Sequence, residues 1–289
     1  MLGSNITKRQ ISVSTVAYDG YAIDVAFAEL AEIGIGLVEP AYIKGYMIFD
    51  EADFSDAASS TLRHKLVQHG LRAAAISAHM DSGNAEAGEM MARRIRFAAG
   101  IGANYVITNA TTVERRQELQ RVIADNLKLA ENLGVFIALE NPGNGIGNLM
   151  VDGKSGSELV NSFNSKSLRM NYDTANALTC TEGAVRPETD IDYALPFMCH
   201  AHLKDVVQVD GGWRYVAIGK GELDYAAILA KLKLRPEIPL TLELPLRLKR
   251  KFHQEPERAP DLPDLIDVRL AVRSSWNCVA QAFGDMPFI

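Results

Sequence analysis

Several features are scarce or missing in this sequence of 289 residues, and each absence excludes a class of protein. There are only three cysteines, an odd number, which argues against a framework of disulfide bonds. No apolar run reaches membrane-spanning length, and no apolar stretch follows the basic residues near the N-terminus. We therefore expect a cytoplasmic protein that carries no secretory signal and does not bind membranes.

Basic residues are not in excess, because 30 Lys and Arg stand against 36 Asp and Glu, for a formal net charge of −6. Proteins that bind nucleic acid usually carry the opposite balance, so we expect no nucleic-acid partner. Hydrophobic residues make up 47% of the chain and charged residues 23%, which is typical of a soluble globular protein. A chain of this length can bury a large core, which excludes global disorder.

Short apolar and β-branched runs alternate with longer segments whose apolar residues recur at helical spacing. The strand candidates are residues 10–16, 35–40, 72–79, 103–109, 135–140, 168–173, 198–204 and 238–243. The clearest helical segments are residues 22–33, 55–69, 88–101 and 112–133. This alternation is typical of βα units that build a parallel sheet. Eight such runs predict an α/β fold, a (β/α)₈ TIM barrel formed as a single domain by residues 1–289.

An open, doubly wound sheet is the alternative fold. It would need a phosphate-binding loop after its first strand, but the segment AYDGYAID at that place has only one glycine. Gly70, Gly100 and Gly134 stand between helical segments and the strands that follow them. We expect each of them to adopt the left-handed conformation that ends a helix.

In a barrel of this kind the chemistry lies where the strands end at the C-terminal face. Glu140, Asp173 and Glu243 end three of the predicted strands, and His202 lies near the end of another. Alone, each residue would more often cap a helix or form a salt bridge, but charged side chains inside a barrel need a partner or a metal. Three carboxylates and one imidazole suit one divalent metal ion, with Mn²⁺ as the first choice and Mg²⁺, Co²⁺ or Zn²⁺ as alternatives.

A resemblance to the xylose isomerase-like TIM barrel superfamily rests on five segments: LEN (139–141), NYDTAN (171–176), HAHLKD (200–205), IGKGELDY (218–225) and LTLE (240–243). This superfamily contains sugar isomerases and epimerases, with inosose dehydratase and endonuclease IV as relatives. The resemblance implies that Glu140, Asp173, His202 and Glu243 bind one divalent metal, and that the two glutamates are also the catalytic acid and base. It further implies a small carbohydrate substrate and a homodimer or homotetramer.

Some positions depart from particular members of this superfamily. Its ketohexose epimerases carry a histidine after strand six and an arginine after strand seven, where this chain has Asn176 and Gln208. Endonuclease IV needs further histidines for three zinc ions. Of those positions His79 is retained, whereas Asn109 and Asn176 replace two others. A trinuclear DNA-repair site is therefore not expected.

Five side chains at or near the expected barrel mouth are candidate substrate contacts: His79, Glu39, Lys204, Asn109 and Trp213. Glu39 and His79 end strands opposite the proposed metal, where they could bind sugar hydroxyls. Lys204 faces inward and could pair with a substrate oxyanion or hold Glu243. His200, one layer deeper, is expected to be a hydrogen-bonded core histidine.

Two further segments lie outside the βα repeat. Residues 206–218 have an Asp-Gly turn between β-type residues, which predicts a hairpin over the mouth that could bring Trp213 onto a sugar ring. Residues 246–265 mix a basic cluster with three prolines and predict a long loop, with a lid or a subunit contact as the alternative. The loop 219–221 lacks the third glycine of a dinucleotide motif, although a phosphate could bind there.

The predicted function is a divalent-metal-dependent sugar isomerase or epimerase that abstracts a proton beside a carbonyl and forms an enediolate. The alternative is a metal-dependent lyase, a dehydratase or eliminase that acts on a keto-sugar or inosose with the same first base. The replacements at Asn176 and Gln208 favour this alternative. A metal-free sugar-binding barrel is the third hypothesis.

Overall fold

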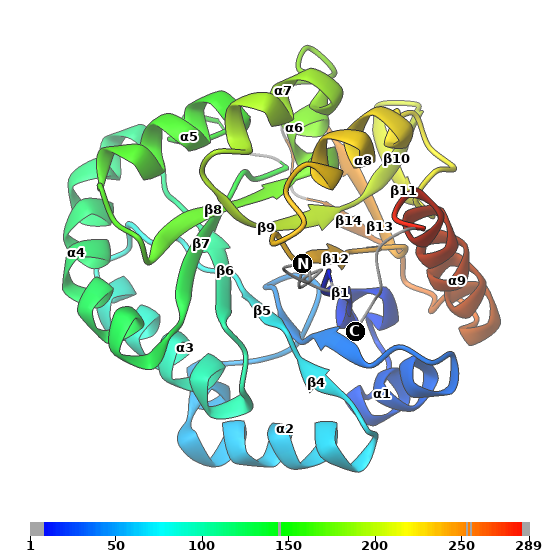
Figure 1. Cartoon of the computed structure of the whole chain (residues 1–289), viewed down its shortest axis with the longest axis horizontal. Coiled ribbons are helices and arrows are strands. Elements are labelled where there is room, and N and C mark those ends of the chain that lie inside the picture. Colours follow the sequence, from blue (N-terminus) through cyan, green and yellow to red (C-terminus); the bar gives the residue numbers. More distant parts are fainter. Residues whose placement is uncertain (1–8, 144–145, 253, 255, 285–289) are drawn as a thin grey trace, which may run out of the picture.

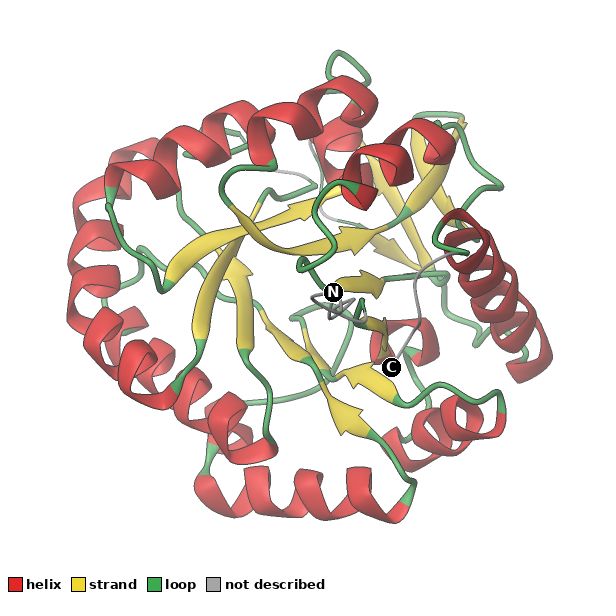
Figure 2. Cartoon of the chain, viewed as in Figure 1, coloured by secondary structure: helices red, strands yellow, loops and turns green. Residues whose placement is uncertain are grey.

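A ring of parallel strands lies inside a layer of helices in the computed structural model of the chain (Figures 1 and 2). The structure describes residues 9–143, 146–252, 254 and 256–284. The strand segments of the ring are β1 (Ile11–Ser14), β2 (Leu37–Glu39), β3 (Ala41–Tyr42), β4 (Arg72–Ala73), β5 (Ala75–Ala78), β6 (Tyr105–Asn109), β7 (Phe136–Glu140), β8 (Leu168–Asp173), β9 (Met198–Leu203) and β12 (Leu240–Leu242).

These ten segments make eight barrel strands. Pro40 separates β2 from β3, and Ala74 separates β4 from β5, so each pair is one interrupted strand. The order in the sheet is β3-β5-β6-β7-β8-β9-β12-β1-β2-β4, and these neighbouring strands pair in parallel. Because β2 pairs with β4 and β3 pairs with β5, the two ends of this order meet. The (β/α)₈ TIM barrel prediction is confirmed, and each predicted strand overlaps one barrel strand.

The helices alternate with the strands along the chain and cover the ring from outside (Figure 2). Their bounds are α1 (Ile23–Glu32), α2 (Asp56–Gln68), α3 (Ala87–Ile101), α4 (Arg116–Leu133), α5 (Gly153–Ser162), α6 (Thr174–Cys180), α7 (Pro187–Ala194), α8 (Tyr225–Lys233) and α9 (Leu265–Ala282). Several begin at a side chain that caps the first turn, as Ser55 and Asp152 do for α2 and α5. Within the described residues, no helix is both long enough and apolar enough to span a membrane.

The glycine prediction is right at two positions and wrong at one. Gly134 ends α4 with φ 66°, and Gly70 follows the end of α2 with φ 69°. Gly100 instead lies inside α3, which ends at Gly102 with φ 83°. A Cβ at Gly100 would lie 2.6 Å from Ser59 Oγ, so this glycine allows α3 to pack closely against α2.

A small antiparallel sheet lies beside the barrel, in the order β10-β11-β13-β14 (Figure 1). Its strands are β10 (Asp205–Val209), β11 (Gly212–Val216), β13 (Leu248–Lys251) and β14 (Glu257–Arg258). The first two form a hairpin within the range predicted for one, with Gln208 opposite Trp213. The range 246–265, expected to be a long loop, instead contains β13 and β14, because β13 pairs with β11. The small sheet thereby fixes part of the barrel mouth.

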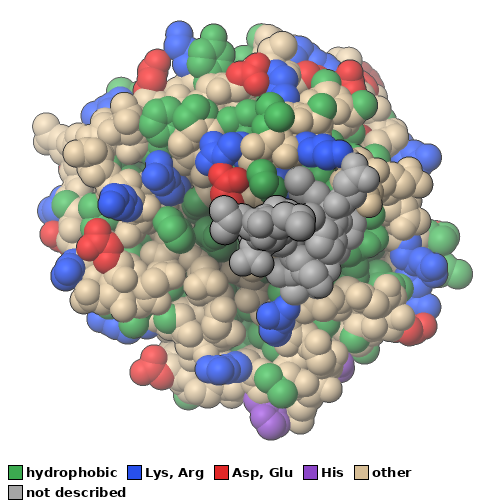
Figure 3. Space-filling view, viewed as in Figure 1, with side chains coloured by type: hydrophobic (Ala, Val, Ile, Leu, Met, Phe, Trp, Pro, Cys, Tyr) green, Lys and Arg blue, Asp and Glu red, His purple; other side chains and the backbone are tan. Residues whose placement is uncertain are grey.

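Positive and negative side chains are interspersed over the face of the molecule seen in the space-filling view (Figure 3).

The interior is apolar throughout most of the barrel, with a continuous cluster of buried Val, Ile, Leu, Phe and Ala side chains. A group of buried polar and charged side chains at the strand ends interrupts this core. Such groups are costly to bury unless they are paired, so their arrangement points to a site.

Candidate metal centre

Four side chains from neighbouring strands meet at one end of the barrel. Glu140 is the last residue of β7, Asp173 the last of β8, and His202 lies opposite Asp173 on β9. Glu243 directly follows β12 and donates its backbone N–H to Leu203 on β9. Each of the four is at most 1% exposed, and each offers a ligand atom within 4.8 Å of the others. The parallel register of the strands is what brings them together.

Nδ1 of His202 faces the three carboxylates. It lies 2.6 Å from Glu243 Oε2, 2.9 Å from Glu140 Oε2 and 3.8 Å from Asp173 Oδ2. Nδ1 itself, Asp173 Oδ2 and Glu243 Oε2 lie in ion-pair range of neighbours, yet neither they nor Glu243 Oε1 have a partner with hydrogen-bond geometry. Buried polar atoms normally have such a partner. Orphaned oxygens and a nitrogen around one point fit a divalent cation, and the donor set suits Mn²⁺, Mg²⁺, Co²⁺ or Zn²⁺.

Lys204 places an ammonium group at the edge of this cluster. Its Nζ lies 2.7 Å from Asp173 Oδ2, 2.9 Å from Glu243 Oε2 and 4.0 Å from Glu140 Oε1. Of the two predicted roles for Lys204, holding Glu243 is therefore the one visible in the geometry. Burial acts to lower the pKa of Lys204, but these carboxylates outweigh it and hold the pKa well above its ordinary value. The side chain is therefore a permanent positive charge in the site.

The carboxylates respond differently to the same burial, which acts to raise every one of their pKa values. The positive charges of His202 and Lys204 outweigh burial at Glu243 and lower its pKa to about 2. His202 and His79 do the same at Glu140, whose pKa lies well below its ordinary value. At Asp173 burial and the two neighbouring glutamates prevail over Lys204, and the pKa rises to about 6. Asp173 is therefore the carboxylate that most readily takes up a proton.

Both oxygens of Glu140 also accept hydrogen bonds from side-chain amides. Asn171 Nδ2 donates to Oε2 at 2.8 Å, and Asn176 Nδ2 donates to Oε1 at 2.9 Å. Asn141 binds the backbone of Asp173 through its amide N–H and its carbonyl oxygen, and so ties β7 to β8. Sequence reasoning missed Asn171, although it precedes Asp173 by two residues on one strand and therefore faces the same side.

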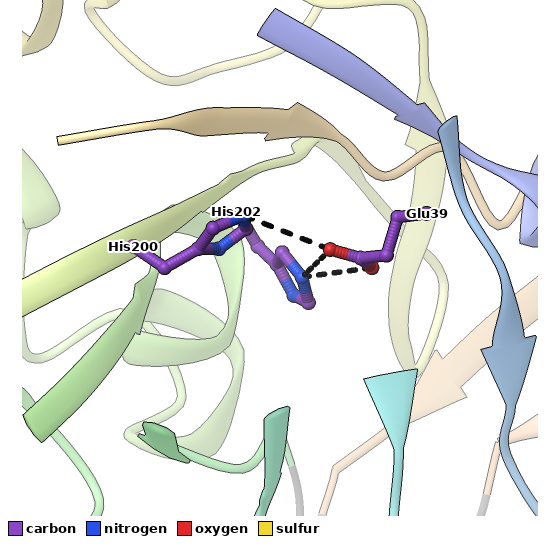
Figure 4. A group of neighbouring side chains, drawn as sticks. All are labelled: Glu39, His200 and His202. Atoms are coloured by element: carbon purple, nitrogen blue, oxygen red, sulfur yellow. Dashed lines mark hydrogen bonds and ion pairs between the residues drawn. The ribbon is translucent and has the colours of Figure 1, made fainter. Parts of the chain in front are cut away.

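Glu39 lies beneath the cluster, away from the cavity where a substrate contact was expected. It is fully buried and accepts hydrogen bonds from Ser77 Oγ at 2.6 Å and Thr241 Oγ1 at 2.9 Å. Its two oxygens also lie 3.1 and 3.2 Å from Nε2 of His202 (Figure 4). The reason is depth, because the barrel strand continues beyond Glu39 through β3 to Tyr42. A carboxylate in this place orients the imidazole so that Nδ1 faces the cluster.

His200 is the hydrogen-bonded core histidine that the sequence predicts. Its Nδ1 lies 2.8 Å from Asn171 Oδ1 and its Nε2 lies 3.1 Å from Thr241 Oγ1. Burial lowers its pKa to about 4, so the ring is neutral at physiological pH. With Glu39 and His202 it forms a second group that could offer three ligand atoms (Figure 4). Hydrogen bonds donated by Ser77 and Thr241 to Glu39, and the bond that Asn171 Oδ1 accepts from His200, already occupy this group.

A cavity of about 240 Å³ opens over Glu140 and Glu243. This volume lies below the range of roughly 300–1,000 Å³ for drug-sized ligands and so favours a small substrate. Three of the expected substrate contacts line it: His79, Asn109 and Lys204. His79 Nε2 lies 3.5 Å from Glu140 Oε2 and has no hydrogen-bond partner.

Trp213 does not line this cavity, in contrast to the expectation. It is 4% exposed on β11, and its ring packs edge-on against Phe252 with the ring centroids 6.3 Å apart. The cavity instead has Tyr46 and Arg250 in its wall, two side chains that sequence reasoning did not single out. Buried and exposed residues alternate along Leu248–Lys251, so Arg250 lies on the inward face of β13.

The loop 219–221, considered as a phosphate site, is already filled by a carboxylate of the chain itself. Asp205 Oδ2 accepts hydrogen bonds from the backbone N–H groups of Gly219 and Gly221 at 2.9 and 2.8 Å, and Oδ1 accepts one from Leu223 at 3.3 Å. A Cβ at Gly221 would lie 2.1 Å from Asp205 Oδ1. These amides are therefore not available to a phosphate.

Comparison with known proteins places this geometry in a family. The sequence model described as "Xylose isomerase-like TIM barrel" matches residues 27–267. The chain belongs to the xylose isomerase-like TIM barrel family. No curated protein sequence matches the chain.

Solved structures of this family share the fold at low sequence identity. A xylose isomerase domain protein from Planctomyces limnophilus is 18% identical, with a TM-score of 0.71 over 96% of this chain and 99% of that one. An L-ribulose 3-epimerase is 16% identical, with a TM-score of 0.69 over 96% of each chain. The probable 3-DHS dehydratase AsbF from Bacillus anthracis is 16% identical, with a TM-score of 0.65 over 91% of this chain and 97% of that one. The neighbours thus include both epimerases and a dehydratase.

Proposed function

We propose that this protein is a divalent-metal-dependent isomerase or epimerase of a small sugar or keto-sugar. The observation that carries the proposal is the set of four buried side chains at the strand ends, with orphaned atoms facing one another beneath a cavity. Glu140, Asp173, His202 and Glu243 would hold the ion. A divalent cation at this place polarises a substrate oxygen and acidifies the adjacent C–H.

Two of these side chains are placed to move a proton. Glu140 and Glu243 both line the cavity, but they come from strands that are not neighbours, β7 and β12. One carboxylate can therefore remove a proton from one face of a substrate carbon while the other returns it on the opposite face. The amide hydrogen bonds of Asn171 and Asn176 fix Glu140 in orientation. Lys204 would stabilise negative charge that develops on the enediolate.

A lyase that eliminates water from a keto-sugar or inosose is the second candidate. It would use the same first proton abstraction, followed by loss of a hydroxyl group that takes up a proton. Asn176, which stands where ketohexose epimerases carry a histidine, donates to Glu140 and cannot itself transfer a proton. Gln208, where those enzymes carry an arginine, is exposed on β10 and does not line the cavity. These two positions favour elimination over free ketose epimerisation.

Mass spectrometry of keto-sugars incubated with the Mn²⁺-loaded protein in D₂O separates the two candidates. Isomerisation or epimerisation exchanges a carbon-bound hydrogen for deuterium without other change in mass, whereas elimination gives a product lighter by one water with an enone absorbance. Removal of the metal with a chelator should stop either reaction. A protein that binds sugars, holds no metal by elemental analysis and is not stabilised by Mn²⁺ would instead be a metal-free binding barrel.

Substitution of each glutamate tests the roles of the two carboxylates. Glu140→Gln and Glu243→Gln should each abolish turnover and leave the fold intact. Glu158→Gln, the same chemical change at an exposed residue of α5, should keep full activity. Near-full activity in either site variant would show that the two-glutamate mechanism is wrong.

A further inference from the structure

We propose that the substrate carries an acidic group, a carboxylate or a phosphate, that binds to Arg250. This inference rests on the proposed function for the position of the reacting carbon, but its evidence is separate. Arg250 is 5% exposed, lies on β13 and forms part of the cavity wall together with Glu140, Glu243 and Lys204. Its Nη1 is buried and has no hydrogen-bond partner. An orphaned guanidinium nitrogen beside a cavity points to a missing acceptor.

The contacts that Arg250 does make leave its charge unmatched. Nε lies 2.9 Å from the hydroxyl of Tyr215, and Nη2 lies 3.3 Å from the hydroxyl of Tyr46. Both partners are phenol hydroxyl groups, and burial raises the pKa of Tyr46 to about 12. Within the described residues, no carboxylate lies in ion-pair range of Arg250. A buried cation of this kind gains most from an anionic partner.

The other buried arginines of the described chain differ from Arg250 in this respect. Arg94 forms two hydrogen bonds of 2.8 Å with Glu51. Arg247 donates to backbone carbonyl oxygens and also lies in ion-pair range of the Asp19 carboxylate. Arg9 donates to three backbone carbonyl oxygens. Each of these side chains has charged or carbonyl acceptors within the protein, whereas Arg250 has neither.

The backbone around Arg250 is shaped to hold the guanidinium at the cavity. Pairing of Trp213 with Arg250 fixes its place on β13. A Cβ at Gly143 would lie 2.8 Å from both Nε and Cζ of Arg250 and 2.5 Å from Asn176 Oδ1. The glycine therefore lets the guanidinium approach the loop that follows Glu140. The geometry leaves Nη1 as the donor for a ligand.

The charges of the surrounding wall agree with an acidic ligand. Lys204 is matched by Asp173 and Glu243, whereas Lys44 adds an exposed positive charge at the mouth. Asp81, an acidic residue in the same wall, is paired with Arg115 at 2.8 Å. A short sugar acid or sugar phosphate could thus place its reacting carbon at Glu140 and Glu243 and its anionic group on Arg250. Planar guanidinium groups bind both kinds of anion.

The test measures binding rather than turnover, on the full chain loaded with Mn²⁺, by titration calorimetry. Three probes differ only at carbon 1: D-glucitol, D-gluconate and D-glucitol 1-phosphate. The wild-type protein should bind one or both anionic probes at least about 10-fold more tightly than D-glucitol. Preference for D-gluconate or for the phosphate identifies the acidic group. Equal affinity for all three, or no binding of either anion, would overturn the proposal.

Arg250→Gln should remove this preference, weakening the binding of the anions by about 10-fold to 100-fold and leaving that of D-glucitol unchanged. Arg250→Lys keeps the positive charge but loses the planar guanidinium group. Its affinity for the anions should lie between that of the wild type and that of Arg250→Gln. Lys249→Gln removes the same charge from the exposed face of the same strand and should behave as wild type. A purely structural role would lower the affinity for D-glucitol and Mn²⁺ together with the anions, which also contradicts the proposal.

The outcomes separate this inference from the proposed function. If anions bind through Arg250 but no substrate exchanges deuterium or loses water, the anion site stands and the proposed function fails. If turnover occurs on neutral keto-sugars and Arg250→Gln does not change the choice of ligand, the proposed function stands and the anion site fails.

Discussion

The carboxylate of Glu39 lies 3.1 Å from Nε2 of His202, on the side of the ring opposite the three carboxylates that face Nδ1. This contact holds a proton on Nε2 and turns the other nitrogen toward the cluster. Glu39 therefore acts on the site through His202 without facing the cavity.

Glu39→Gln should weaken Mn²⁺ binding by about 10-fold to 100-fold, because an amide holds the imidazole less firmly than a carboxylate does. Titration calorimetry with Mn²⁺ measures this change, and ¹⁵N NMR of the imidazole reports whether the tautomer has shifted. Glu158→Gln is the matched control. Metal affinity equal to that of the wild type would show that Glu39 has only a packing role.

Lys204→Gln should change metal affinity in the opposite direction. The ammonium group lies within 2.9 Å of two of the carboxylates and repels a dication, so its removal should tighten Mn²⁺ binding by roughly 10-fold. Turnover should nevertheless fall. Lys220→Gln removes the same charge from an exposed loop and should leave both quantities as they are. Weaker metal binding in Lys204→Gln would mean that Lys204 organises the ligands rather than competing with the ion.

Mn²⁺ binding should release protons and strengthen as pH rises. Burial acts to lower the pKa of His202, but Glu243, Glu39 and Glu140 outweigh it and hold the pKa well above its ordinary value. The ring is therefore protonated in the metal-free protein at neutral pH, and a metal ligand must lose that proton. Below about pH 6 Asp173 adds a second proton to be displaced. Calorimetry in buffers of different ionisation enthalpy counts these protons, and a count of zero at pH 7 would contradict this assignment.

His200 should make the metal-free protein sensitive to mild acid. Its pKa falls from 6.5 to about 4 on burial, so the unfolded chain takes up a proton in this range before the folded one does. The neutral His200 therefore makes its full contribution to the free energy of unfolding above about pH 6.5, and this contribution is lost as the pH falls toward 4. Between pH 7 and pH 5 the loss is about 2 kcal/mol. Urea unfolding of wild type, His200→Gln and the exposed-site control His64→Gln should show that only His200→Gln lacks this loss.

Gly143→Ala should impair the site more than the fold. The new methyl group would meet Arg250 at 2.8 Å and Asn176 Oδ1 at 2.5 Å, and both side chains line the cavity. We expect turnover to fall at least about 10-fold with a modest change in melting temperature. Gly36→Ala, where a Cβ would meet nothing within 4 Å, is the control. Wild-type activity in Gly143→Ala would show that the loop tolerates displacement of these side chains.

The part of the site that could be predicted from the sequence rests on two regularities. Side chains alternate between the two sides of a strand, and parallel strands end at the same face of a barrel. The end of each hydrophobic run predicts, to within about a residue, which side chain lies at the mouth of the barrel. This is enough to predict Glu140, Asp173 and His202. That uncertainty is enough to misplace Glu39, because its barrel strand continues for another three residues and leaves Glu39 too deep to line the cavity. The site of Arg250 depends on the pairing of β13 with β11, a long-range contact that no local pattern encodes.

The carboxylates that would hold the ion come from the barrel, whereas Arg250 comes from the small antiparallel sheet. If both proposals hold, reaction chemistry and choice of substrate would reside on different sheets of one chain. The strands β13 and β14 carry none of the four proposed ligands, and Arg258 at the end of β14 is tied to the barrel by its ion pair with Asp19. Exchange of the segment from β13 to β14 between members of the family would therefore test whether substrate preference can change while the reaction is retained.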